Sequence, residues 1–395
     1  MANIVDYLIW RGDLTFEERP FNFVDNLVLC SLSYIGFDGA ADWANGGTCT
    51  LAEAAQWFTG LPPEQQHIRS PLDREFLHLA AASARFGGIR LLRHGGKFSP
   101  EQELQFSATT FLLTPDLAYV AYRGTDSTLV GWKEDFNMAF LPLVPAQLEA
   151  VAYLNDLVFL PQTHLLVGGH SKGGNLAVFA AAGCDEALQN RISAVFSNDG
   201  PGFDRAFLDG PNYRRILDRV HLLIPQSSII GRLLEHEGDC RVLHSDDSGL
   251  GQHDLYTWQV LGTEFQWEEG VDATSLVVDQ SIKSWLDAMA PEEREAFINQ
   301  VYAAMQATNV KTLREFSEDK VKNYASLFRS WRELPQDSRK FMTASTKKLL
   351  SAFRSTLSGQ LKVTGGEKMA VLEEKLRRME DLIRREENAE PPEEE

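Results

Sequence analysis

The feature that most constrains the fold is an apolar run that changes character at one serine. Residues 164–181 read HLLVGGHSKGGNLAVFAA, with a short strand-like segment before Ser171 and a helix-like segment after it. A sharp turn from strand to helix needs small residues two before and two after its central residue, and Gly169 and Gly173 meet that need. The pattern predicts a serine nucleophile held in a strained backbone conformation at the turn. An ordinary glycine-rich turn is the alternative interpretation.

The segments around this turn alternate between strand-like and helix-like patterns. Helices are expected over 71–86, 146–160, 173–183 and 203–219, and strands over 104–113, 117–124, 163–169, 192–200 and 220–226. The first two strands are separated by the sequence Thr-Pro-Asp, which is typical of a tight turn and predicts a hairpin. Alternation of strands with helices favours an α/β fold with a mostly parallel central sheet.

The sequence pattern changes near residue 275. Downstream, charged residues are interleaved with Leu, Phe, Trp and Met at helical spacing, which predicts an all-α extension. We expect an α/β domain with an N-terminal helical segment over 1–270, a helical region over 271–362, and a charged helix with an acidic tail over 363–395. The last helix carries an apolar stripe: Met369, Leu372, Leu376, Met379 and Ile383. Packing within its own helical bundle is the favoured interpretation of the stripe, and self-association as a coiled coil is the alternative.

Charge and composition exclude several classes of function. The chain has 395 residues and a formal net charge of −18, which repels nucleic-acid phosphates and anionic membrane surfaces. No segment reaches the roughly eighteen apolar residues of a membrane span, and residues 1–18 lack the pattern of a secretory signal. The four cysteines lie far apart without metal-type spacing, so buried free thiols are expected, and no metal or cofactor. These observations predict a soluble, cytoplasmic protein without a nucleic-acid partner.

Two motifs resemble those of a known family. The sequence GGHSKGGNLA around Ser171 resembles the GHSLGGALA elbow of the class 3 lipase branch of the α/β-hydrolase superfamily, and YRGTD at 122–126 resembles that branch's oxyanion segment, FRGT. The resemblance covers roughly residues 70–265, and the elbow with lysine after the serine is similar to a bacterial branch of hydrolase-like proteins. It implies an α/β-hydrolase fold, followed here by the helical extension. Lys172 is the departure from the lipase elbow.

An acyl-transfer site also needs donors for the oxyanion. Two backbone N–H groups near the carbonyl oxygen are the usual solution. The N–H of Lys172, directly after the nucleophile, is expected to be one donor whatever its side chain, and the resemblance implies Thr125 as the second. Gly124 allows the backbone to approach closely. An ordinary turn at the end of a strand is the alternative interpretation of the Arg-Gly-Thr-Asp sequence. The favoured interpretation of the Lys172 side chain is a solvated flank of the elbow, and binding of an acidic substrate group is the alternative.

The general base is expected to be a histidine downstream of the serine. His221 opens an apolar strand, which favours a structural role, and His236 and His244 lie among charged loop residues. His253 lies in the glycine-rich loop GLGQHDLYTW, before an aromatic run that resembles the family's histidine region. We therefore predict that His253 is the base, with a surface-loop histidine as the alternative.

The acid is the position where the sequence departs most from the resemblance. The class 3 branch has its aspartate after the strand that here covers 220–226, and this chain has Ser227 and Ser228 there. One strand earlier, AVFSNDGPGF contains Asp199, which is predicted to orient the histidine. A role only in the Asp-Gly-Pro-Gly turn is the alternative. Asp246 and Asp247, in the loop before the histidine, are the other candidates.

Together these residues predict a serine hydrolase of the esterase or lipase type, with Ser171, Asp199 and His253 as its triad. Its expected substrate is a small-molecule acyl ester or thioester, with a lipid-like acyl chain as one candidate. The segment over 227–251 is expected to cover the site. Four of its apolar residues are available either to line an acyl pocket or, as the equally favoured alternative, to pack a helix against the sheet: Ile229, Ile230, Leu233 and Leu234. An acyltransferase with the same nucleophile and a non-catalytic interaction protein are the alternative functions.

Overall fold

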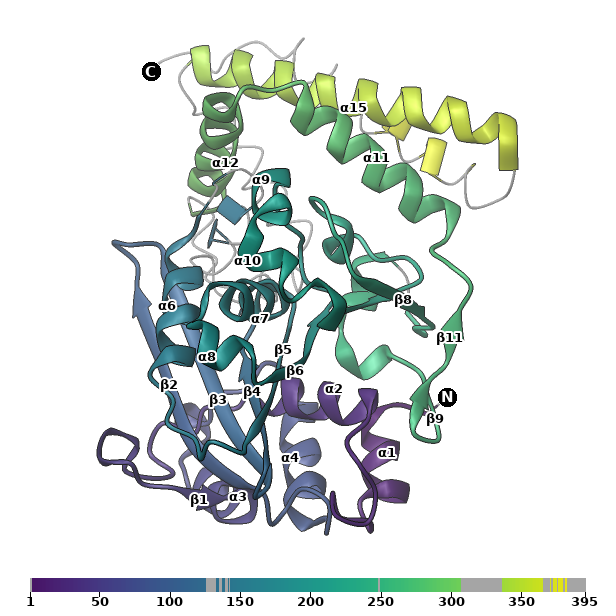
Figure 1. The fold of residues 1–395 in the computed structure, drawn as a ribbon. Helices are drawn as coiled ribbons and strands as arrows, with labels where there is room; N and C mark the ends of the chain where they lie inside the picture. Colours follow the sequence, from purple (N-terminus) through teal and green to yellow (C-terminus); the bar gives the residue numbers. More distant parts are fainter. Residues whose placement is uncertain are drawn as a thin grey trace. The chain divides into compact units, whose positions relative to one another are not determined.

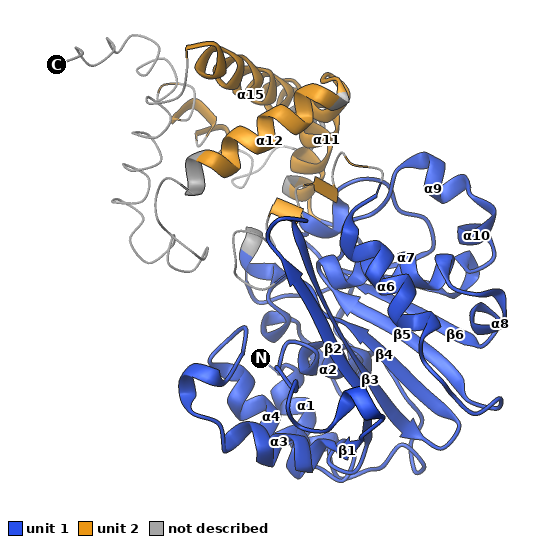
Figure 2. Cartoon of the chain, turned by 90° about the vertical axis from the view of Figure 1, so that its left-hand side faces the viewer, with its two compact units in different colours: residues 1–126, 142–271 blue, residues 127–141, 272–395 orange. Residues whose placement is uncertain are grey.

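The computed structural model describes residues 2–125, 143–247, 249–306 and 336–364, together with residues 133–134, 137–138, 141, 370, 372–374, 376–378 and 381. The chain forms two compact units, one made of residues 1–126 and 142–271 and the other of residues 127–141 and 272–395 (Figure 2). Each unit is described by itself.

The first unit contains a sheet with helices on both sides (Figure 1). Its helices are α1 Ile4–Arg11, α2 Phe23–Leu32, α3 Leu51–Thr59, α4 Leu72–Ala82, α6 Pro145–Asn155, α7 Lys172–Gly183, α8 Glu186–Gln189, α9 Arg205–Asp209 and α10 Pro211–Arg214. Its strands are β1 Cys49–Thr50, β2 Arg90–Ser99, β3 Leu104–Thr114, β4 Leu117–Tyr122, β5 His164–His170, β6 Ile192–Asn198, β7 Val220–Pro225, β8 Asp239–Leu243, β9 Val260–Leu261, β10 Glu264–Phe265 and β11 Trp267–Glu268.

The main sheet is mixed rather than mostly parallel. Its nine strands in the described residues follow the order β1-β2-β3-β4-β5-β6-β7-β8-β11. The strands from β4 to β8 pair in parallel, whereas β1, β2 and β3 at one side and β11 at the other pair antiparallel. The expectation of parallel strands is thus correct for the centre of the sheet. It is wrong for the sides: short hairpin connections join β2 to β3 and β3 to β4, and β1 and β11 pair antiparallel after longer connections.

Strand β4 shows why the sheet is covered on both faces. Its sequence LAYVAY is apolar at nearly every position, the pattern of a strand buried on two sides. Tyr119 and Ala121 belong to the core formed with helices α1 to α4, whereas Ala118, Val120 and Tyr122 belong to the core formed with α6 and α7. Alternate side chains therefore join two separate cores, which makes the unit a three-layer structure.

Several elements differ from the sequence-based expectation. The hairpin and the strand–turn–helix around Ser171 are confirmed. Strand β2 was not expected, and the predicted helix over 203–219 divides into α9 and α10 because Gly210 has extended backbone dihedrals before Pro211. The helix expected over 71–86 ends at Ala82. Three of the four free cysteines are buried as predicted, but Cys240 is exposed.

The second unit is helical in its described part. Its helices are α11 Ala273–Asp287, α12 Pro291–Gln306 and α15 Gln336–Thr364. Val277 of α11 packs with Leu350 and Leu357 of α15, and Leu376 joins the same apolar cluster. The predicted helix and tail over 363–395 lie mostly outside the described residues. Within the described residues, no helix is both long enough and apolar enough to cross a membrane.

Candidate active site

Ser171 lies in the sharp turn between β5 and α7. Its dihedral angles, φ 58° and ψ −132°, are ones that residues with side chains rarely adopt. Small neighbours are required here: a Cβ on Gly169 would lie 2.1 Å from the Gly173 carbonyl oxygen, and one on Gly173 would lie 2.1 Å from that of Tyr122. The turn thus places a strained serine at the carboxyl end of a central parallel strand, as the sequence predicted.

Asp199 follows β6, the next parallel strand, and has a φ of 49°. Its side chain is buried, and its Oδ2 lies 2.6 Å from Nδ1 of His253. Its Oδ1 accepts hydrogen bonds from the Ser228 hydroxyl and from the Gly231 N–H. The carboxylate is therefore fully engaged: one oxygen faces the imidazole and the other is fixed by two donors from the segment after β7.

The His253 ring has one nitrogen committed and one available. Nδ1 forms a hydrogen bond with Asp199. When Nδ1–H is the donor and the carboxylate the acceptor, Nε2 of the neutral ring has no proton and can accept one. In the described part of the chain, Nε2 has no hydrogen-bond partner, and the ring makes no hydrogen bond to Ser171. About a quarter of the side chain, 26%, is exposed, so the ring is accessible from solvent. Geometry of this kind often tightens only when substrate binds.

The other candidate residues are engaged elsewhere. His221 lies 3.2 Å from Asp239 Oδ2, and His244 lies 2.8 Å from Glu268 Oε1. Asp246 accepts a hydrogen bond from Gln259. Among the histidines and aspartates considered from the sequence, the structure joins Asp199 with His253.

The RGT segment passes directly beside the nucleophile. A Cβ on Gly124 would lie 3.2 Å from the Ser171 Cβ and 2.4 Å from the His170 carbonyl oxygen, so a glycine is needed for this approach. Thr125 follows in the chain and is half-buried. Lys172 is the first residue of α7, and its N–H therefore belongs to the first turn, where a helix offers no acceptor of its own. The two predicted donors therefore directly follow residues that meet at the elbow: Lys172 follows Ser171, and Thr125 follows Gly124.

The side chain of Lys172 contradicts the favoured expectation. It is 1% exposed, and its Nζ donates a hydrogen bond of 2.9 Å to the Gln105 carbonyl oxygen of β3. The side chain is not a solvated flank of the elbow, because the start of α7 lies against the sheet and the lysine side chain points toward β3. The lysine instead ties the helix start to a neighbouring strand.

Two residues beside the elbow were not selected from the sequence. His170 precedes the serine, and its ring is buried between Tyr34, which follows α2, and His253. Burial, together with the electrostatic influence of the His253 ring and of the Arg69 guanidinium, lowers the pKa of His170 well below its usual value. The position of His170 inside the elbow motif was a signal for its importance. Tyr34 carried none, because it lies 136 residues away in the chain.

The segment expected to cover the site is only partly ordered into regular structure. It contains the 3-10 turn Ile230–Arg232 and strand β8, and it reaches the start of the 3-10 turn Gly249–His253. Four of its apolar side chains are half-buried: Ile229, Ile230, Leu233 and Leu234. Its Gly231 N–H contacts Asp199, which places the segment next to the candidate triad. Within the described residues, no group of three or more His, Cys, Asp or Glu side chains is placed to hold a metal ion.

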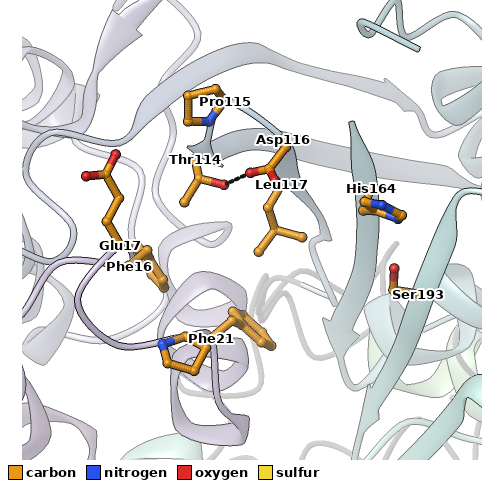
Figure 3. A pocket seen from close by; sticks show the side chains of 10 residues that line it. Phe16, Glu17, Phe21, Thr114, Pro115, Asp116, Leu117, His164 and Ser193 are labelled. Atoms are coloured by element: carbon orange, nitrogen blue, oxygen red, sulfur yellow. Dashed lines mark hydrogen bonds between the residues drawn. The ribbon is translucent and has the colours of Figure 1, made fainter. Parts of the chain in front are cut away.

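A cavity of about 680 Å³ lies at the other end of the sheet. Figure 3 shows its wall, which includes Phe21, the Thr114–Asp116 turn with its internal hydrogen bond, and Ser193. His164, the first residue of β5, also lines it, whereas Ser171 follows the last residue of that strand. The cavity is therefore separate from the elbow, and no residue of the candidate triad lines it.

Comparisons with known proteins give one family and several distant structural likenesses. A native lipase–propeptide complex of Rhizomucor miehei aligns at 16% identity and a TM-score of 0.32, over 45% of this chain and 70% of that one. A deletion mutant of the same complex aligns at 18% identity and a TM-score of 0.31, over 40% of this chain and 56% of that one. M37 lipase aligns at 14% identity and a TM-score of 0.34, over 52% of this chain and 68% of that one. No curated protein matches the sequence. The model of the Mbeg1-like family matches residues 80–303, more than half of the sequence, and the chain therefore belongs to the Mbeg1-like family.

Proposed function

We propose that this protein is a serine hydrolase that cleaves a carboxylic ester or thioester through an acyl-enzyme. The observation that carries the proposal is the 2.6 Å contact between Asp199 Oδ2 and His253 Nδ1, formed beside an elbow that holds Ser171 at φ 58°. A strained serine without a base beside it would indicate only a sharp turn. A buried carboxylate bonded to a histidine whose second nitrogen has no partner in the described residues supplies the base that the serine requires.

The first half of the reaction forms the acyl-enzyme. His253 Nε2 takes the proton of the Ser171 hydroxyl as the oxygen attacks the acyl carbon, and Asp199 stabilises the imidazolium that forms. The backbone N–H groups of Lys172 and Thr125 donate to the oxyanion. The imidazolium then gives its proton to the leaving alkoxide or thiolate, and the bond between the acyl carbon and that group breaks.

The second half releases the acid. A water molecule gives a proton to His253 and attacks the acyl carbon, and the Ser171 oxygen leaves with the proton returned from the ring. The half-buried apolar side chains Ile229, Ile230 and Leu233, on the segment that contacts Asp199, support an apolar acyl group as substrate. An acyltransferase would use the same steps with an acceptor other than water.

Two assays of the full chain test the proposal. One is covalent labelling with a fluorophosphonate, and the other, on unlabelled protein, is hydrolysis of p-nitrophenyl butyrate. We expect the label on Ser171 and a loss of at least about a thousandfold in kcat for Ser171→Ala. Ser193→Ala is the matched control, because Ser193 is exposed and lines the cavity at the other end of the sheet. Equal labelling and activity in Ser171→Ala would rule out the proposed nucleophile.

A further inference from the structure

We propose that His170 is a positioning residue for the general base, held as one neutral tautomer by Tyr34. This inference rests on the proposed function, since it assigns the base to His253. His170 Nε2 lies 2.9 Å from the backbone carbonyl oxygen of His253. The two imidazole rings also stack, with centroids 4.4 Å apart and planes inclined by 37°. His170 thus contacts both the main chain and the ring of the base.

The hydrogen bonds determine which nitrogen of His170 carries the proton. A carbonyl oxygen only accepts, so Nε2 of His170 must be the donor to His253. Nδ1 of the neutral ring is then an acceptor, and the Tyr34 hydroxyl, 2.8 Å away, is the group that donates to it. Tyr34 is itself buried, so this bond forms in a place without competing solvent. The carbonyl contact places a proton on Nε2, and the Tyr34 hydroxyl, which also lies 3.4 Å from the His170 carbonyl oxygen, completes the neutral Nε2–H form where it donates to Nδ1.

The surroundings of His170 favour the same state. The titratable and charged groups that face it come from three segments: Tyr34 after α2, Arg69 before α4, and His253 in the 3-10 turn Gly249–His253. The Arg69 guanidinium lies 5.1 Å from the centre of the Tyr34 ring. A positive group nearby and complete burial both lower the pKa of His170, which opposes its protonation.

A neutral ring at this position has a consequence for the base. His253 becomes positively charged when it takes the Ser171 proton, and a second imidazolium stacked on it at 4.4 Å would oppose that step. A neutral His170 permits the step. Its hydrogen bond to the His253 carbonyl oxygen also holds the loop, so that the His253 ring keeps its contact with Asp199. Both effects act on the proton transfer rather than on substrate binding.

Two substitutions separate these contributions. Tyr34→Phe keeps the aromatic ring and removes only the hydroxyl that bonds Nδ1, whereas His170→Phe keeps a ring beside His253 and removes the donor to its carbonyl. We expect kcat to fall by up to about a hundredfold in His170→Phe with KM nearly unchanged, because the base is displaced and substrate contacts are kept. We expect Tyr34→Phe to shift the acidic limb of the kcat/KM profile, because His170 then competes for the proton. His78→Phe, at an exposed position of α4, is the control.

Nitrogen NMR of the histidine-labelled full chain gives a readout that does not depend on hydrolysis. The wild type should show His170 as the neutral Nε2–H tautomer down to about pH 6 and below, assigned by the signal lost in His170→Phe. The opposite tautomer, or a charged His170 at that pH, would overturn the inference. So would a folded His170→Phe with wild-type kcat and pH profile. Absence of labelling at Ser171 alongside the expected tautomer would instead reject the proposed function and, with it, the assigned role in catalysis.

Discussion

Replacement of Asp199 by asparagine tests whether this residue acts as the proposed acid or only as a turn residue. Asparagine keeps the size of the side chain and tolerates a φ of 49° as aspartate does. Its amide oxygen can keep the position that accepts from the Ser228 hydroxyl and the Gly231 N–H. The amide NH₂ group then faces His253 Nδ1, where the second carboxylate oxygen lies in the wild type.

This orientation imposes the wrong tautomer on the base. An NH₂ group donates, so Nδ1 of His253 must accept and the ring proton must lie on Nε2. Nε2 is then unable to take the proton of Ser171. By analogy with the aspartate-to-asparagine change in known serine triads, we expect kcat to fall by about 10⁴-fold, or about 5 kcal/mol of activation free energy, with little change in KM. Folding stability should change little, because both donors to Oδ1 keep their acceptor.

The assay is hydrolysis of p-nitrophenyl butyrate by variants whose folding is matched by thermal melts. Asp246→Asn and Asp247→Asn are the controls, and both should be nearly silent. Asp246 accepts from Gln259 and lies 3.8 Å from His244 Nε2, which is not the proposed base. An Asp199→Asn variant within about threefold of the wild-type kcat would refute the tautomer argument. An inactive Asp246 or Asp247 variant beside an active Asp199→Asn would move the acid to the loop before His253.

Two further predictions concern stability at low pH and the approach of the RGT segment. Burial lowers the pKa of His94 from 6.5 to about 4, and its Nε2 accepts from the Phe37 N–H, so the folded state binds this proton less well than the unfolded chain. Neutral His94 therefore contributes about 3 kcal/mol to the free energy of unfolding. This contribution is complete above about pH 6.5 and is lost as the pH falls toward 4. Unfolding by urea at several pH values should show that His94→Gln removes most of this slope and that His78→Gln does not. Gly124→Ala should abolish esterase activity, because the added Cβ would lie 2.2 Å from the Tyr34 hydroxyl and 2.4 Å from the His170 carbonyl oxygen. Activity above about a tenth of wild type in a folded Gly124→Ala would contradict the close approach.

The sequence identified the parts of the molecule whose local pattern agrees with their final structure. The elbow is such a part, because the apolar run, the glycines and the following helix all require the same turn. Strand β2 is the opposite case. Its sequence RLLRHGGKFS contains two glycines and four basic residues, a composition that does not favour a strand. It forms because β3 pairs with nearly its full length, and such long-range pairing is invisible in a single segment.

The site shows the same division. Ser171 and His253 were distinguished by their local sequence, but three aspartates were compatible with the acid, and only the folded chain joins Asp199 to His253. The burial of Lys172 was also invisible, since a lysine after the serine reads as solvated until the helix is placed against β3. Tyr34 reaches the elbow from the N-terminal helices. Contacts of this kind depend on the packing of the layers rather than on the residue's neighbours in sequence.

The position of Asp199, the proposed acid, follows from the parallel register of β6 and β7. Asn198, the last residue of β6, pairs with Leu223, and the Asp199 N–H donates to the Leu223 carbonyl oxygen, so the chain leaves β6 beside the end of β7. Ser228, which occupies the region where the class 3 resemblance implies an aspartate, is then close enough to donate to Asp199. Because adjacent parallel strands end at one edge of the sheet, a carboxylate after β6 reaches the same histidine loop as one after β7. The serine therefore supports the carboxylate from the neighbouring strand, and the departure from the lipase pattern is compatible with an intact acid–base pair.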